Sequence, residues 1–380
     1  MKIPNKELNR RKQEVVDYLE SNELDGMLIT DPYNLFYMLD FFFVPTERPF
    51  FCLITKSGKV LVVAPNLERE VGELKIVDDI FTYFDYPGRP DLYSWIIKSL
   101  IELDSGLKRM AVDNISLGLS QVFESELEAI VDSNLIYQLR LTKSEIEAER
   151  LRIAAKYADY IVSVGADNIK TGISELELLD LMQSKTLQKM VAELDEIIFV
   201  PGGPCGGLVP FGKNTSLPHA LPSNNQLQQG DTMILSCGAN YRGYRVESER
   251  TFFFGQPSTR QKEGFIVMKE AQELGLSLIK PGVTCAEVDD QVLSFIREAG
   301  YSEAIRHRTG HGKGLQEHED PWVEGGDQTI IQPGMVLSCE PGVYLEGFAG
   351  FRHSDTVIVT EDGVEVLTKF SKELDDLILS

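Results

Sequence analysis

The chain has few histidines, few basic residues for its acidity, and no long apolar run. All five histidines lie at or after His219, and 37 Lys and Arg stand against 59 Asp and Glu, a net charge of -22 at pH 7. A protein this acidic repels phosphate backbones and anionic lipid headgroups. No stretch approaches the ~20 apolar residues that a membrane-spanning helix needs. We therefore expect a soluble protein that binds neither nucleic acid nor a membrane.

Cysteine is also scarce. The five cysteines are odd in number and widely scattered, and no two of them form a Cys-x-x-Cys pair. This usage favours free thiols in a reducing compartment over a disulfide framework or a zinc ribbon. The first twenty residues lack the apolar core and the small-residue cleavage site of a signal peptide. The expected location is the cytoplasm.

The first ~140 residues alternate helix and strand patterns, which predicts an α/β domain. The patterns predict helices over 6–21, 67–74, 92–103 and 120–130, and strands over 25–30, 50–55, 59–63, 109–113 and 134–139. This part contains no glycine-rich phosphate loop. We place a domain boundary near Arg140, which divides the chain into domains 1–140 and 141–380.

The second part repeats itself. Residues 169–178 (IKTGISELEL) align without gaps with residues 279–288 (IKPGVTCAEV), an offset of about 110 positions. Each copy has a glycine helix stop and then a helix start with a glutamate three residues after the capping Ser or Thr. The capping pairs are Ser174 with Glu177 and Thr284 with Glu287, and a similar pair, Ser144 with Glu147, begins a long helix that runs toward Ala166.

This repeat predicts two related halves packed about a pseudo-twofold axis, with an antiparallel sheet. The expected strands are 196–200, 231–236, 246–254, 335–338 and 355–359. Because ligand sites favour crevices between packed units, we expect the functional site between the two halves.

Five segments of this part have unusual compositions. They are residues 211–219, 231–251, 309–321, 333–344 and 350–356. Each has a structural explanation when taken alone; the run Gly-His-Gly-Lys-Gly could form a tight loop, for example. However, Glu247 and Glu249 alternate along a strand that continues into Phe252–Phe254. Two carboxylates on one face of a half-buried strand are costly unless a cation or a proton lies opposite.

Taken together, the segments resemble the creatinase/prolidase/methionine-aminopeptidase superfamily, which is peptidase family M24 and also holds aminopeptidase P. The resemblance rests on GHGKGLQEHEDP at 310–321 and PGMVLSCEPGVY at 333–344, and it covers the whole chain. It implies an α/β (α+β) protein with a creatinase-type N-terminal domain and a duplicated pita-bread domain. It also implies a homodimer.

The resemblance implies an altered metal site. The peptidase members hold two metal ions on Asp, Asp, His, Glu and Glu, and the matching positions here are Ser236, Glu247, His311, Glu340 and Ser354. A serine hydroxyl is a poor ligand for a divalent ion, so we expect no dinuclear centre. Creatinase, the metal-free hydrolase of the superfamily, has similar departures and also a glutamate before Arg-Thr, as Glu249 stands here. Two alternatives stay open. Either no metal binds, or one divalent ion such as Mn, Co or Zn binds to Glu247, His311 and Glu340.

In the metal-free alternative, the resemblance assigns roles to individual residues. His219 would carry the proton to the leaving nitrogen, and His311 and His318 would bind or polarise the carbonyl. Glu340 and Glu249 would hold a cationic or N–H-rich part of the substrate. Further substrate contacts are expected at Glu247 and Arg352, and at Arg48, which would reach the partner subunit's site and pair with a substrate carboxylate.

The expected activity is hydrolysis of a C–N bond in a small amide, amidine or dipeptide. Creatine itself is not the expected substrate, because Glu247 puts a carboxylate where creatinase has a small neutral residue. One alternative is a mononuclear, metal-dependent Xaa-Pro dipeptidase or aminopeptidase, and another is a catalytically silent binding protein. The number of titratable groups expected in one crevice favours an enzyme.

Overall fold

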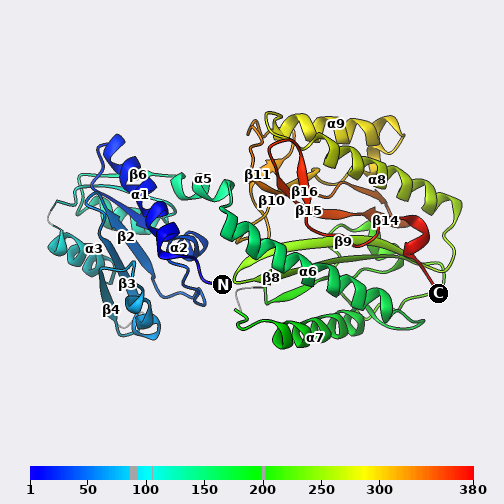
Figure 1. The fold of residues 1–380 in the computed structure, drawn as a ribbon, viewed down its shortest axis with the longest axis horizontal. Coiled ribbons are helices and arrows are strands. Elements are labelled where there is room, and N and C mark those ends of the chain that lie inside the picture. Colours follow the sequence, from blue (N-terminus) through cyan, green and yellow to red (C-terminus); the bar gives the residue numbers. More distant parts are fainter. Residues whose placement is uncertain (86–91, 105, 199–201) are drawn as a thin grey trace. The chain divides into compact units, whose positions relative to one another are not determined.

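The computed structural model describes residues 1–85, 92–104, 106–198 and 202–380, and they form two compact units, Met1–Arg140 and Leu141–Ser380 (Figure 1). Each unit has its own sheet. Among the described residues, no helix combines the length and the apolar character needed to cross a membrane.

The first unit is a six-stranded sheet in the order β4-β3-β2-β1-β5-β6. Its strands are β1 (Gly26–Ile29), β2 (Phe51–Thr55), β3 (Val60–Pro65), β4 (Asp79–Tyr83), β5 (Arg109–Val112) and β6 (Ala129–Asp132). Its helices are α1 (Asn5–Ser21), α2 (Pro32–Leu39), α3 (Leu92–Leu103), α4 (Leu117–Glu124), α5 (Leu135–Leu141) and the 3-10 helix η1 (Asn66–Glu73). Strand β2 runs antiparallel to both of its neighbours, and the other pairs are parallel. Leu28, Leu53, Ile96, Leu100 and Phe123 contribute to a core that joins the sheet to α3 and α4.

Two predictions for this unit were wrong. Residues 135–139 of the segment 134–139, predicted as a strand, lie in helix α5, because a short apolar run does not distinguish a buried strand from a buried helix. The helix predicted over 120–130 begins earlier, where the Ser116 side chain accepts a hydrogen bond from Leu119, and it ends at Glu124. The last two residues of the predicted helix, Ala129 and Ile130, begin β6, which pairs in parallel with β5.

In the second unit, all four long helices begin with a capping box. They are α6 (Glu145–Asp167), α7 (Glu175–Glu193), α8 (Thr259–Leu278) and α9 (Cys285–Glu298), and their caps are Ser144, Ser174, Ser258 and Thr284. The predicted repeat extends to the backbone. Gly172 donates to the Leu227 carbonyl in the first half, and Gly282 donates to the Ile331 carbonyl in the second.

One sheet joins the two halves, in the order β11-β10-β12-β15-β9-β8-β7, with β16 beside β15 and β17 beside β9. The strands are β7 (Cys205–Leu208), β8 (Thr232–Tyr241), β9 (Tyr244–Phe254), β10 (Gly310–Gly312), β11 (Glu319–Val323), β12 (Val336–Cys339), β15 (Ser354–Val359), β16 (Val364–Val366) and β17 (Ile378–Leu379). A separate hairpin pairs β13 (Gly342–Leu345) with β14 (Ala349–Arg352), and 3-10 turns occupy η2 (Gly212–Ser216), η3 (Ser302–Ala304) and η4 (Leu374–Leu377).

The joint between the halves is the antiparallel pairing of β15 with β9, where Ser354 lies opposite Glu249. Helix α6 packs on β8 and β9, and α8 packs on β12, β13 and β14 (Figure 1). Four of the five strands predicted here are present. Residues 196–198 of the fifth are not a strand, and its last two residues lie outside the described residues.

Candidate active site

A cavity of about 650 Å³ lies in the second unit and is lined by residues of both halves. Seven predicted site residues line it: His219, Glu247, Glu249, His311, His318, Glu340 and Arg352. The eighth, Arg48, lies in the first unit, where its guanidinium donates hydrogen bonds to Asp85 and Glu47. Its role in a partner subunit stays a prediction.

The strand register explains how the first half supplies its carboxylates. On β9, Glu247 lies opposite Gly238 of β8, and Glu249 lies opposite Ser236. Because side chains alternate along a strand, both carboxylates point to the same face. This face forms part of the cavity wall.

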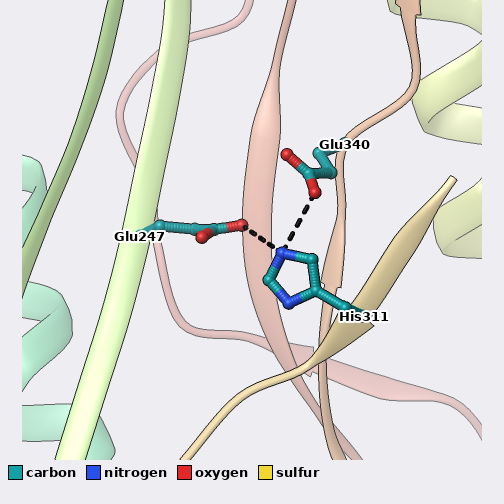
Figure 2. A group of neighbouring side chains, drawn as sticks. All are labelled: Glu247, His311 and Glu340. Carbon is teal, nitrogen blue, oxygen red and sulfur yellow. Dashed lines mark ion pairs between the residues drawn. The ribbon is translucent and has the colours of Figure 1, made fainter. Parts of the chain in front are cut away.

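His311 lies between two carboxylates (Figure 2). Its Nε2 atom is 3.0 Å from Oε1 of Glu340 and 3.7 Å from Oε1 of Glu247. Its Nδ1 atom is 3.0 Å from the Gly312 carbonyl oxygen, which can only accept, so Nδ1 carries a hydrogen. Burial alone would lower the pKa of His311, but the nearby charges of Glu247 and Glu340 outweigh it and raise that pKa.

Glu249 is held by an arginine of the second half. Arg352 donates to both of its carboxylate oxygens, from Nε at 2.5 Å and from Nη2 at 3.0 Å, and the Ser236 hydroxyl also donates to it. The Nη1 atom of Arg352 donates to the Pro218 carbonyl at 3.1 Å, next to His219. Glu249 and Arg352 were both expected to contact substrate, and they also form an ion pair with each other.

Sequence reasoning missed Lys313, whose side chain is fully buried. Its Nζ atom donates to Oε2 of Glu247 at 2.8 Å and to the Glu317 carbonyl at 2.9 Å. Burial alone would lower the pKa of Lys313, but the charges of Glu247 and Glu317 outweigh it and raise the pKa, so the ammonium stays charged. The sequence signal that could have found it is a lysine between two glycines in the motif at 310–321.

A second residue missed by sequence reasoning is His307, which lines the same cavity. Its Nδ1 atom donates to the Arg308 carbonyl, so its Nε2 atom accepts from the Tyr344 hydroxyl at 2.8 Å, and that hydroxyl accepts from Arg352. Burial lowers the pKa of His307, which keeps its ring neutral. The His318 ring lies edge-on to the His311 ring, with 4.1 Å between the ring centroids, whereas His219 is an exposed residue of the cavity wall.

The donor set does not fit a dinuclear metal centre. At two of the five positions stand Ser236 and Ser354, and each hydroxyl donates its hydrogen to a carboxylate, Glu249 in the first case and Glu247 in the second. A donating hydroxyl beside carboxylates is a poor metal ligand. The remaining three, Glu247, His311 and Glu340, offer ligand atoms that all lie within 4.8 Å of one another, the spacing of a possible single-ion site.

The chain matches two known families. Residues 149–361 match metallopeptidase family M24, and residues 11–142 match the creatinase/prolidase N-terminal domain. An uncharacterized peptidase of Staphylococcus aureus (strain USA300) is 32% identical over 360 residues, which cover 94% of this chain and 98% of that protein.

Solved structures agree in fold. An Xaa-Pro dipeptidase from Bacillus anthracis is 27% identical, with a TM-score of 0.84, and the match covers 97% of this chain and 99% of that one. A prolidase from Pyrococcus horikoshii is 26% identical, with a TM-score of 0.83, and the match covers 96% and 99% of the two chains. These matches confirm the predicted family and fold class: the chain belongs to the M24 peptidase family, with a creatinase/prolidase-type N-terminal domain.

Proposed function

We propose that this protein is a metal-independent hydrolase of a C–N bond in a small amide, amidine or dipeptide, with His219 as the acid–base residue. The observation that carries the proposal is the charge pairing in the cavity wall. Lys313 neutralises Glu247, a carboxylate at one of the metal-ligand positions, and Arg352 neutralises the neighbouring Glu249, so both carboxylates of β9 already have protein cations as partners. The family supports a peptidase-type reaction.

Without a Lewis acid, hydrolysis depends on proton transfer and on a polarised carbonyl. A water molecule adds to the carbonyl carbon and gives a proton to His219. His219 passes this proton to the leaving nitrogen as the C–N bond breaks. The imidazoles of His311 and His318, which contact each other on the cavity wall, bind or polarise the carbonyl.

Glu340 is the carboxylate best suited to a cationic part of the substrate. In the described part of the chain, no lysine or arginine lies within ion-pair distance of it. Burial would raise the pKa of Glu340, but its contact with His311 outweighs this effect and lowers the pKa, so the group stays ionised. A protonated substrate amine would complete the charge balance at this position.

The test is the variant His219→Ala, assayed on Xaa-Pro and other dipeptides, small amides and amidines. We expect turnover to fall by about 10²- to 10⁴-fold, the usual contribution of general acid–base catalysis. The melting temperature should stay unchanged, because His219 is exposed. Leu217→Ala is the matched control, since Leu217 is an exposed neighbour in the same segment that does not belong to the cavity lining. Normal turnover by His219→Ala would refute the assignment.

A second candidate is a mononuclear, metal-dependent Xaa-Pro dipeptidase. It is favoured by the close grouping of Glu247, His311 and Glu340, and by solved relatives named as Xaa-Pro dipeptidase and prolidase. Turnover that chelator abolishes and added Mn²⁺ restores would select it. Binding without turnover over the whole panel would select a silent binding protein. A cytoplasmic location and a homodimer remain predictions.

A further inference from the structure

We infer that the Lys313 ammonium is a built-in cation that takes the place of a metal ion at Glu247 and prevents divalent ions from binding to Glu247, His311 and Glu340. The inference rests on the metal-independent form of the proposed function. It goes further because it names the residue responsible, and it predicts that one substitution creates an ion site.

Lys313 is fixed in place by both its backbone and its side chain. Its backbone N–H donates to the Val336 carbonyl at 2.9 Å, directly after β10. An ammonium group has three donors, and Nζ has three oxygen neighbours: Oε2 of Glu247 at 2.8 Å, the Glu317 carbonyl at 2.9 Å and Oε2 of Glu317 at 3.5 Å. Because the side chain is fully buried, Nζ would lose these hydrogen bonds if it moved away from Glu247.

Both carboxylate oxygens of Glu247 accept hydrogen bonds from other side chains. Oε2 accepts from Lys313, and Oε1 accepts from the Ser354 hydroxyl at 2.9 Å. An ion bound between His311 and Glu247 would have to compete with these two donors for the same carboxylate. It would also lie beside the positive charge of Lys313, whose Nζ atom is 2.8 Å from Glu247, and in a buried site such repulsion is weakly screened.

The charges of the cavity wall lead to the same conclusion. Glu247, Glu249 and Glu340 carry three negative charges, Lys313 and Arg352 carry two positive charges, and His311 is a further group that can carry a proton. A divalent ion would turn this nearly neutral group positive. If a neutral side chain replaced Lys313, Glu247 would lack its cation, and a bound divalent ion would restore the charge balance.

The test is a titration of chelator-stripped protein with Mn²⁺ and Zn²⁺, followed by calorimetry and by melting temperature. Lys313→Met should bind about one equivalent at least tenfold more tightly than the wild type, and its melting temperature should rise with the ion. Lys313→Arg, which keeps the charge, should behave as the wild type. Adding Glu247→Gln to Lys313→Met should abolish the new binding.

A matched control exists in the same unit. Lys143 is also buried and donates to a buried glutamate, Glu319, at 3.0 Å, but Glu319 does not line the cavity, whereas Glu247 does. Lys143→Met should lose stability as Lys313→Met does, without gaining an ion site. If Lys313→Met does not fold, Lys313→Gln provides a second neutral side chain.

Two results would overturn the inference: wild type that binds one equivalent as tightly as the neutral variants, or folded neutral variants that bind no ion. The readout is ion binding and does not depend on turnover. A failure here is therefore distinguishable from a failure of the proposed hydrolase, which the His219→Ala assay tests.

Discussion

The two halves of the second unit use the same helix start for different purposes. Ser174 and Thr284 cap equivalent helices, and the next residue is fully buried in both, Glu175 in the first half and Cys285 in the second. The Glu175 carboxylate accepts five hydrogen bonds from the segment 211–225, which carries His219. The donors are Phe211 N, Asn214 Nδ2, Ser223 N, Ser223 Oγ and Asn225 Nδ2.

Cys285 has no such role. Burial, with a smaller contribution from the charge of Asp327, raises the pKa of its thiol to about 12, so it packs as a neutral side chain. The two copies therefore share a backbone arrangement but differ in this residue. Glu175 of the first copy anchors the segment 211–225, which carries the candidate catalytic residue His219. Duplication alone did not create the site.

The halves also differ in the charges they contribute to the cavity. In two ion pairs, the first half supplies the carboxylates of Glu247 and Glu249, and the second half supplies the cations of Lys313 and Arg352. Each pair crosses the boundary between the halves. These pairs tie assembly of the site to assembly of the unit.

The largest expected effect comes from breaking one crossing pair with Arg352→Met. Removing the guanidinium leaves the Glu249 carboxylate buried without its cation, and breaking a buried pair in this way costs about 3–5 kcal/mol. Urea unfolding of the variant should show this loss of free energy, and Arg352→Lys, which keeps a positive charge, should show a smaller one. A loss below ~1 kcal/mol for Arg352→Met would mean that the pair does not hold the halves together.

A smaller effect is expected when Glu175 is changed to Gln. The amide places an N–H₂ group against donors that need an acceptor, and each unsatisfied buried donor costs about 1–3 kcal/mol. We expect a loss of about 2 kcal/mol in unfolding free energy and faster proteolysis within residues 211–225. Cys285→Ala in the other half is the comparison variant and should leave that segment as resistant as in the wild type. Equal proteolysis in the two variants would contradict the anchoring role.

The smallest effect is the acid sensitivity of a third crossing pair, which has the opposite polarity. Arg250 of the first half donates to Asp355 of the second at 2.7 Å. Burial would raise the pKa of Asp355, but Arg250 and then Lys372 outweigh it and hold the pKa below its ordinary value.

Because the folded pKa is depressed, this stabilisation is fully present above the unfolded pKa of ~3.9 and is lost as the pH falls toward the folded value. Stability should fall below about pH 4 by up to ~1.4 kcal/mol per pH unit from this group. Asp355→Asn should remove this part of the pH dependence in urea unfolding at pH 3 to 7. An unchanged slope would show that other groups cause the acid sensitivity.

Much of the fold was predictable because its signals are local. Capping boxes, such as those at Ser174 and Thr284, depend on residues three positions apart, and the motifs at 310–321 and 333–344 are contiguous. Helix α5 was missed because a seven-residue apolar segment satisfies both periodicities.

The predicted site residues of the second unit do line one cavity, but their pairing was not predictable. The contact of Lys313 with Glu247 joins residues 66 positions apart, and the contact of Arg352 with Glu249 joins residues 103 positions apart. The sequence indicated that the carboxylates of β9 needed a cation. It did not identify the side chains that supply one, because these depend on how β10, β12, β15 and β9 pair.

The central claim is that protein cations replace metal in this cavity, and elemental analysis of wild-type protein purified without chelator tests it most directly. The same preparation is melted in Mn²⁺, Co²⁺, Zn²⁺ and chelator. We predict no stoichiometric metal and one melting temperature in all four conditions. About one equivalent of tightly held metal, with a melting temperature that chelator lowers, would contradict the claim and indicate a mononuclear peptidase on Glu247, His311 and Glu340.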